Sequence, residues 1–234
     1  MAAESWVLGL DVCPGGWAGI CWSGTKVVGV FGTTVVSVIE RATIAIENSP
    51  ISVIGVDMFI GLPDKSVRQA DSLARLAIGP RRSSVFNAPI RTALEAATYA
   101  EALVISRNRT DRGFSAQAFA MRTKALEIDR FIREVKVPLI EVHPEVSFAE
   151  VNGEPLIFSK KTWSGLDLRR HLLANNDMQI PESLGELGKR ANPDDILDAA
   201  AVAWTAMRFH RGVAKSLPSP PEAFSDGIPA AIWF

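Results

Sequence analysis

The segment SVIGVDMFIGLP, residues 52–63, constrains the fold more than any other stretch of the chain. Its residues are apolar without the alternation that a half-solvated strand would show, which predicts a central parallel strand buried on both faces. Such a strand is typical of an α/β sheet. Asp57 is the one charge inside it, and a lone buried carboxylate costs several kcal/mol unless it is paired or bound to a metal.

Further strand-like segments lie on both sides of this one. Three short β-type runs open the chain, at residues 6–12, 17–22 and 26–31, and the turns between them suit hairpins. Residues 35–47 have helical spacing, and residues 137–148 predict a fifth strand. A last helix begins after the N-cap Asn192 and ends at Gly212, and residues 216–234 predict an irregular tail.

A mostly helical stretch, at about residues 64–136, separates the fourth and fifth strands. It contains predicted helices over 66–78 and 91–106, and a third that Ser115 caps and that reaches about residue 135. This order of elements is the RNase H-like layout. We therefore predict a single RNase H-like α/β domain over residues 1–234. Its mixed sheet would have three antiparallel strands plus two parallel strands, with flanking helices and the helical insertion between strands four and five.

Composition narrows the class of protein and of partner. Apolar residues make up 47% of the chain and charged residues 22%, as in folded globular proteins. The net charge of -1 gives no global basic field, so any contact with nucleic acid must come from local patches. Cys13 and Cys21 are interpreted as reduced core thiols. No signal peptide and no membrane span is predicted, which favours a cytoplasmic protein.

Acidic residues recur at the ends of the predicted strands and on the last helix. The carboxyl ends of adjacent parallel strands meet at one edge of a sheet, and a helix that crosses this edge can add its own acids. Clustered carboxylates repel one another, and hard divalent cations relieve that repulsion. The sequence therefore predicts Mg²⁺ or Mn²⁺ bound by a set of carboxylates: Asp11, Asp57, Glu141, Glu145, Asp195 and Asp198.

A carboxylate site of this kind suits phosphodiester hydrolysis. Two metal ions about 4 Å apart can activate a water and stabilise the leaving oxygen. In this hypothesis Asp11 is a shared ligand, and the glycines after it let backbone and phosphate approach closely. The predicted catalytic residues are Asp11, Asp57, Glu145 and Asp198, with His143 in acid-base work.

Simpler roles remain open for several of these residues. Asp11 precedes a Pro-Gly-Gly turn, and an aspartate in that position often bonds its own backbone. Asp195 falls in the first turn of a capped helix, where acids favour the helix dipole, whereas Asp198 lies beyond that turn. His143 is more often a hydrogen-bonded structural histidine than a catalytic one.

Candidate substrate contacts are basic and hydroxylic. The stretch GPRRSSVF offers Arg81, Arg82, Ser83 and Ser84, which suit a phosphate but also a solvated loop. Lys160 and Lys161 stand near Trp163, and Gln117 lies near the start of the third helix of the insertion. The predicted partner is nucleic acid, bound through these patches, and a homodimer is possible.

Seven segments together carry a resemblance to a known family: GLDVCPGGW, VDMFIGLP, GPRRSSVF, SAQAF, EVHPEVSF, SKK and DDILDAAAVAW. In this order they resemble bacterial and archaeal proteins described as predicted RNase H-like nucleases, a domain family of unknown function. The resemblance covers nearly the whole chain. It implies the RNase H-like fold and a metal-dependent nuclease.

Two other functions fit some of the same residues. Actin- and sugar-kinase-like phosphotransferases also place an aspartate and a glycine turn between their first strands, and DVCPGGW looks similar to that turn. A non-catalytic module could use residues 81–84 to hold a phosphate or nucleic acid. Metal-dependent cleavage, a thermal shift with ATP, and binding without turnover would separate the three functions.

Overall fold

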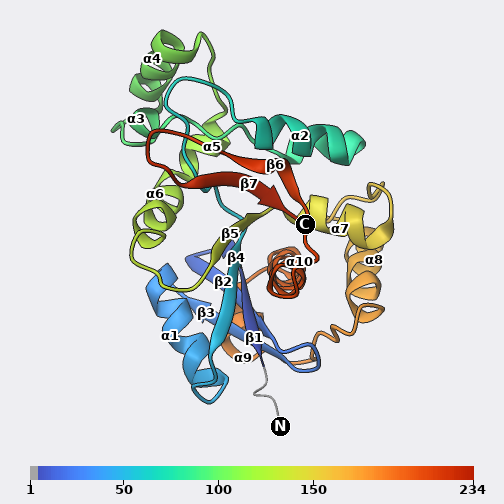
Figure 1. Ribbon diagram of the computed structural model, residues 1–234. Helices are drawn as coiled ribbons and strands as arrows, with labels where there is room; N and C mark the ends of the chain where they lie inside the picture. Colours follow the sequence, from blue (N-terminus) through green and yellow to red (C-terminus); the bar gives the residue numbers. More distant parts are fainter. Residues whose placement is uncertain (1–4) are drawn as a thin grey trace.

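The computed structural model describes residues 5–234, and its centre is a seven-stranded sheet in the order β3-β2-β1-β4-β5-β7-β6 (Figure 1). Neighbours among β1, β4, β5 and β7 are parallel, and the remaining pairs are antiparallel. The predicted mixed α/β architecture is confirmed, with seven strands in place of five. The strands are β1 (Trp6–Cys13), β2 (Gly16–Trp22), β3 (Val27–Gly32), β4 (Ile51–Val56), β5 (Leu139–Val142), β6 (Ser216–Ala223) and β7 (Pro229–Trp233).

Helices cover both faces of the sheet. In Figure 1, α1 and α6 lie on one side, and α7, α8 and α10 lie on the other. No helix among residues 5–234 has the length and apolar character of a membrane span. The helices are α1 (Val35–Ala45), α2 (Gln69–Ile78), the 3₁₀ helix η1 (Gly79–Ser84), α3 (Arg91–Leu94), α4 (Tyr99–Thr110), α5 (Ala116–Ala120), α6 (Arg122–Phe131), α7 (Pro144–Asn152), α8 (Trp163–Ala174), α9 (Gly185–Arg190) and α10 (Pro193–His210).

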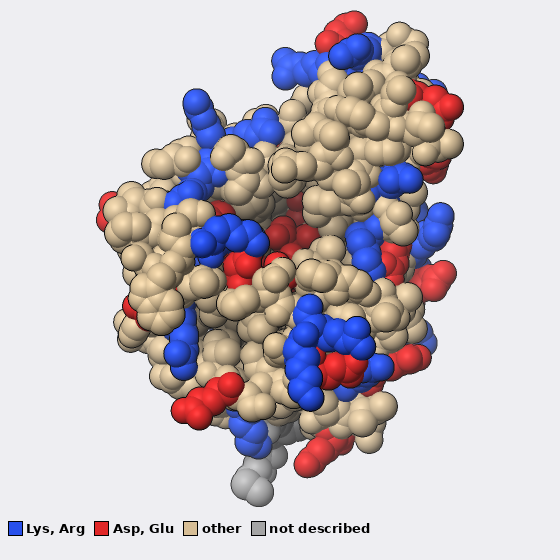
Figure 2. All heavy atoms as spheres, turned by 180° about the vertical axis from the view of Figure 1, so that it is seen from behind, with Lys and Arg blue, Asp and Glu red and all other residues tan. Residues whose placement is uncertain are grey.

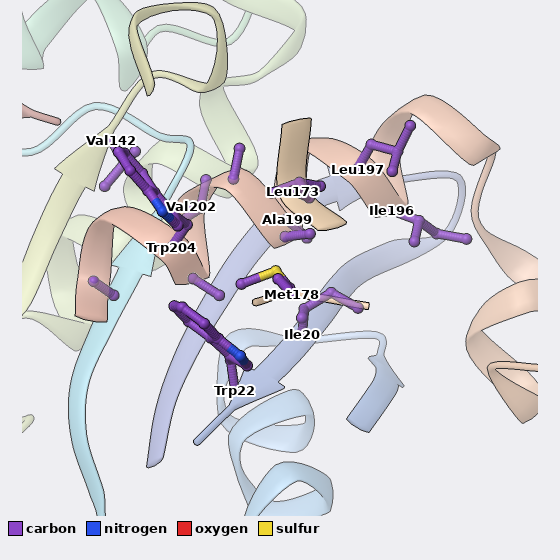
Figure 3. Packing of buried hydrophobic residues seen from close by; sticks show 14 of the residues in the cluster. Ile20, Trp22, Val142, Leu173, Met178, Ile196, Leu197, Ala199, Val202 and Trp204 are labelled. Atoms are coloured by element: carbon purple, nitrogen blue, oxygen red, sulfur yellow. The ribbon is translucent and has the colours of Figure 1, made fainter. Parts of the chain in front are cut away.

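Helix α10 lies directly on the central strands because small residues let the two backbones approach. A Cβ atom on Gly9 of β1 would lie 2.2 Å from both the Ala199 carbonyl oxygen and the Ala203 nitrogen, so only glycine fits there. Figure 3 shows residues of α10, among them Val202 and Trp204, packed near side chains of the sheet and of α8. This close contact fixes Asp198, one residue before Ala199, beside the end of β1.

The C-terminal residues were expected to form an irregular tail, and that expectation is wrong. Residues 216–223 and 229–233 form β6 and β7, and β7 pairs in parallel with β5. Three prolines lie in β6, which is tolerated because β6 is the edge strand of the sheet and proline lacks a backbone N–H. The high proline content therefore concealed a strand.

Two predicted strands end earlier than expected. Strand β4 ends at Val56, so Asp57 follows the strand rather than lying inside it, and the apolar Met58 and Phe59 are buried in a loop. The fifth strand ends at Val142, because Pro144 begins α7 with its fixed φ angle. Glu145 consequently lies in the first turn of a helix and not on a strand.

The elements between β4 and β5 are helical, as predicted, but they are more numerous and shorter than the three helices expected. The expected helix over 91–106 is two helices, because Thr98 and Glu101 form a capping box that starts α4. The long helix expected after Ser115 is also divided, into α5 and α6, with Met121 between them. The first predicted helix, over 66–78, begins at Gln69 and continues into η1.

Candidate metal centre

Three carboxylates come together at the carboxyl edge of the central strands. Asp11 lies near the end of β1, Asp57 follows β4, and Asp198 lies in α10; one oxygen from each lies within 4.8 Å of the others. The strand register brings the first two side by side, because Leu10 pairs with Val56 and the Asp57 N–H donates to the Leu10 carbonyl at 2.9 Å. We call Asp11, Asp57 and Asp198 the acidic triad.

The acidic triad is shielded from water, which makes its negative charge costly. Asp11 is 7% exposed, Asp198 is 1% exposed and Asp57 is half-buried. Burial raises the pKa of Asp11 well above its usual value, and the charges of Asp57 and Asp198 raise it further. Burial also raises the pKa of Asp57, and it raises the pKa of Asp198 to about 6 although Lys160 opposes the shift. A cation would relieve this cost.

One cation already reaches the acidic triad. The Lys160 ammonium donates to Asp198 Oδ2, and Lys161 pairs with Asp194 Oδ2 at 2.6 Å. Burial alone would lower the pKa of Lys160, but the negative charges of Asp198, Asp11 and Asp57 outweigh burial. The net effect is a raised pKa of Lys160. The two lysines were predicted to contact substrate, and the structure pairs both with acids of α10.

Two acceptor oxygens in and near the acidic triad remain free. Asp198 Oδ1 and Glu145 Oε2 are buried and have no hydrogen-bond partner within residues 5–234. The other Glu145 oxygen accepts from Arg169 Nη2 at 2.6 Å. The charge of Glu145 raises the pKa of both Asp57 and Asp198, so it lies at the border of the acidic triad. Hard divalent cations prefer oxygen donors of this kind, so the residues present fit a metal ion.

Glu141 and Asp195 have other partners. Glu141 accepts from Arg68 Nη1 and Nη2, both at 2.7 Å, and from the Ile60 N–H at 2.6 Å. Asp195 forms a capping box with Asn192 at the start of α10, so the capping role left open above is the one that the structure shows. The structure does not bring either side chain into the acidic triad.

His143 lies beside Asp57 and opens onto a small cavity. Its positive charge, when present, lowers the pKa of Asp57, and its Nε2 lies 3.4 Å from the Ser84 carbonyl oxygen. Asp57, His143 and Ser84 line a cavity of about 70 Å³. His143 Nδ1 is buried and has no hydrogen-bond partner in the described part of the chain. The bond to Ser84 fits a structural role and the unpaired Nδ1 fits acid-base work, so both roles of His143 stay predictions.

The predicted substrate residues of the 81–84 stretch divide between two roles. Arg82 and Ser83 line a groove of about 750 Å³ together with Gln117, so three of the predicted contacts do meet. Arg81 instead donates to the carbonyls of Leu156 and Ile157 and so anchors the segment that leads to Lys160. Ser84 donates to the Arg81 carbonyl. Figure 2 shows acidic side chains inside a hollow, with basic side chains around it.

Several residues of this region were not predicted from sequence. Arg68 and Arg169 fix Glu141 and Glu145, and both are fully buried. Arg75 and Arg107 line the groove with Arg82. Three of these arginines lie in helices and Arg68 directly precedes α2, and an arginine in either place is most often solvated. No local pattern therefore marks the four; only the tertiary fold brings them to the site.

Comparison with known protein families tests whether the chain belongs to the family that its sequence resembles. A family model described as "Protein of unknown function (DUF429)" matches residues 9–223. The chain belongs to the DUF429 family. The matched region contains all three residues of the acidic triad, and the expected domain family of unknown function is thereby confirmed. No match was found among curated proteins or solved structures.

The raised pKa values predict how the stability of this DUF429 protein depends on pH without metal. Asp198 has a native pKa of about 6 against a usual value of 3.8, so between these values the native state holds more protons than the unfolded state. The free energy of unfolding therefore falls as pH rises through this window. Asp11→Asn removes one of the repelling charges. In urea unfolding with chelator, the free energy of unfolding of Asp11→Asn should exceed that of wild type by more at pH 7 than at pH 4. An equal difference between the two proteins at both pH values would contradict the pKa assignments.

Proposed function

We propose that this protein is a metal-dependent nuclease with an RNase H-like fold, and that it hydrolyses phosphodiester bonds of nucleic acid. The observation that carries the proposal is the acidic triad: three carboxylate oxygens within 4.8 Å of one another, at the carboxyl ends of two parallel strands. Ligand sites in α/β sheets lie at that edge. The raised pKa values mark the charge of the acidic triad as only partly compensated by Lys160, and such perturbed groups are typical of functional sites.

Asp11, Asp57 and Asp198 would hold Mg²⁺ or Mn²⁺, with the free Glu145 oxygen as a further ligand. A divalent cation bound there supplies Lewis-acid activation of water and of a phosphoryl oxygen. Asp198 Oδ1 and the neighbouring Glu145 Oε2 are buried without hydrogen-bond partners in the described residues, so a cation would satisfy groups that the protein leaves unsatisfied.

The neighbouring side chains have roles that follow from their positions. Lys160 lies against Asp198 with its side chain one-third exposed, so its ammonium can turn from the carboxylate towards a phosphate. A phosphoryl group gains negative charge on its oxygens during hydrolysis, and a cation in this shielded position stabilises that charge. His143, beside Asp57, can accept a proton from the attacking water or donate one to the leaving oxygen.

The test is cleavage of labelled oligonucleotides, single-stranded and duplex, DNA and RNA, with Mg²⁺, Mn²⁺ or chelator. We expect hydrolysis only with metal, and Asp11→Asn should abolish it. Asp177→Asn is the matched control, because Asp177 is exposed and has a φ angle of 64°, which asparagine tolerates well. Transfer of phosphate from ATP would favour the phosphotransferase alternative, and binding of nucleic acid without hydrolysis would favour the non-catalytic module.

A further inference from the structure

The groove of about 750 Å³ beside the acidic triad has a charge unlike the rest of the protein. Three arginines line it, Arg75, Arg82 and Arg107, and its lining contains no aspartate or glutamate. The whole chain has 25 basic and 26 acidic residues, so this local excess of positive charge is not a consequence of composition. The groove therefore suits an anionic ligand, and its volume is in the range of about 300–1,000 Å³ that ligand sites occupy.

Two of these arginines have guanidinium groups available to a ligand. Arg82 and Arg107 are exposed, and neither guanidinium group has a hydrogen bond or ion pair within residues 5–234. Arg75 has a different role, because its Nε and Nη2 both donate to the Val85 carbonyl, at 3.0 and 2.7 Å. It fixes the wall of the groove, whereas Arg82 and Arg107 can each bind a phosphate with two parallel hydrogen bonds.

Aromatic side chains accompany these charges. Tyr99 and Phe114 line the same groove, with their ring centroids 5.9 Å apart and their planes at 79°. The Tyr99 hydroxyl donates to the Phe114 carbonyl at 2.6 Å, which fixes the orientation of the tyrosine ring. Ser83, Asn87 and Gln117 add neutral polar groups. Arginines beside fixed aromatic rings are the combination with which proteins bind unpaired nucleotides, the backbone on the cations and the bases on the rings.

The groove and the acidic triad are neighbours. Val85 and Phe86 line both the groove and the small cavity that contains Asp57 and His143. A strand with one phosphate at the acidic triad can therefore pass the wall at residues 84–86 and enter the groove. We propose that the groove binds an unpaired segment of the substrate strand next to the bond that is cut, with its phosphates on Arg82 and Arg107 and its bases against Tyr99 and Phe114.

The inference rests on the proposed function and makes it more specific: the substrate is single-stranded where it is bound. A recessed site favours such a substrate, because Asp11 and Asp198 are almost completely buried and a flexible strand reaches them more readily than a rigid duplex does. A net charge of -1 also gives no global basic field to attract the dense phosphates of a duplex.

Binding is measured by fluorescence anisotropy with a labelled 20-nucleotide single strand and with its duplex. Both are tested in chelator, with Asp57→Asn as the parent protein, so that cleavage does not interfere. We expect the single strand to bind more tightly, and the double variant Arg82→Ala with Arg107→Ala to weaken its binding by about tenfold or more. The dependence of log K on log salt should become less steep by about 0.7 for each lost phosphate contact. Arg109→Ala, on the same helix as Arg107 but outside the groove, should change binding less than twofold.

The outcomes separate the two proposals. Unchanged binding by the double variant, tighter binding of duplex, or equally tight binding of a mononucleotide would overturn the groove assignment, whatever the cleavage assay shows. Groove-dependent binding of single strands would support it even if the wild-type protein hydrolyses no nucleic acid, and the nuclease proposal alone would then fail. Melting curves of each variant establish that it is folded.

Discussion

Replacement of Arg68 by methionine should lower the free energy of unfolding by about 3–5 kcal/mol, the usual result of removing one partner from a buried ion pair. Arg68 is fully buried and binds two acids at once, Asp71 at 2.5 Å and Glu141 at 2.7 Å. Methionine fills similar space but leaves both carboxylates without their cation. The charges of these acids raise the pKa of Arg68 despite its burial, so the guanidinium stays charged in the native state.

The measurement is urea unfolding of the variant and of a matched control. Arg130→Met suits this purpose, because Arg130 is exposed on α6 and a surface change there costs at most about 0.5 kcal/mol. The experiment also decides the role of Glu141, which was predicted as a metal ligand. A loss below about 1 kcal/mol for Arg68→Met, the low end for an ordinary mutation, would mean that Arg68 does not hold Glu141, and would return this residue to the candidate ligands.

The second large effect concerns Asp57→Asn, which should abolish hydrolysis while leaving the fold intact. Loss of a residue that only orients a metal ligand reduces metal affinity or activity by about 10–100-fold, so loss of a ligand should cost at least about 100-fold. Without metal the variant should be as stable as wild type or more so, because burial and the charge of Glu145 raise the pKa of Asp57. Cleavage assays and melting curves with chelator measure the two effects.

Asp57 is the better position for this test than Asp198. Asp198→Asn would also break the contact with Lys160, so its effect would combine loss of a ligand with loss of an ion pair. Asp57 has no ion pair in the described residues and is held in place by its backbone hydrogen bond to Leu10. A drop in the metal-free melting temperature of Asp57→Asn as large as that of Arg68→Met would contradict a ligand role and indicate a structural one.

The acidic triad was predictable because each of its members is marked by local sequence. Asp11 and Asp57 follow apolar strand segments, and Asp198 has apolar neighbours beyond the capping turn of α10. Parallel pairing of β1 and β4 then brings the first two together, as the pattern of residues 52–63 predicts. Local sequence thus reveals which elements carry these residues, although it misplaced the ends of β4 and β5.

The partners of the other acids could not be predicted, because they come from distant parts of the chain. Arg68 is 73 residues from Glu141 in sequence, and Lys160 is 38 residues from Asp198. The strand predicted over residues 137–148 included Glu145, but Pro144 starts a helix, so Glu145 lies in the first turn of α7. The groove was only partly predicted for the same reason. Arg107 and Tyr99 reach it because of where α4 packs in the folded chain, and no local sequence pattern indicates that position.

Calorimetric titration with Mn²⁺ at pH 7 tests most directly whether the acidic triad binds a divalent cation. Wild type and the Asp177→Asn control should give the same saturable isotherm. At a concentration 100 times the dissociation constant, the metal should raise the free energy of unfolding by about 2.7 kcal/mol. Asp57→Asn should give no saturable binding in the same range. An isotherm for Asp57→Asn equal to that of wild type, or no binding by wild type, would contradict the assignment of the metal centre.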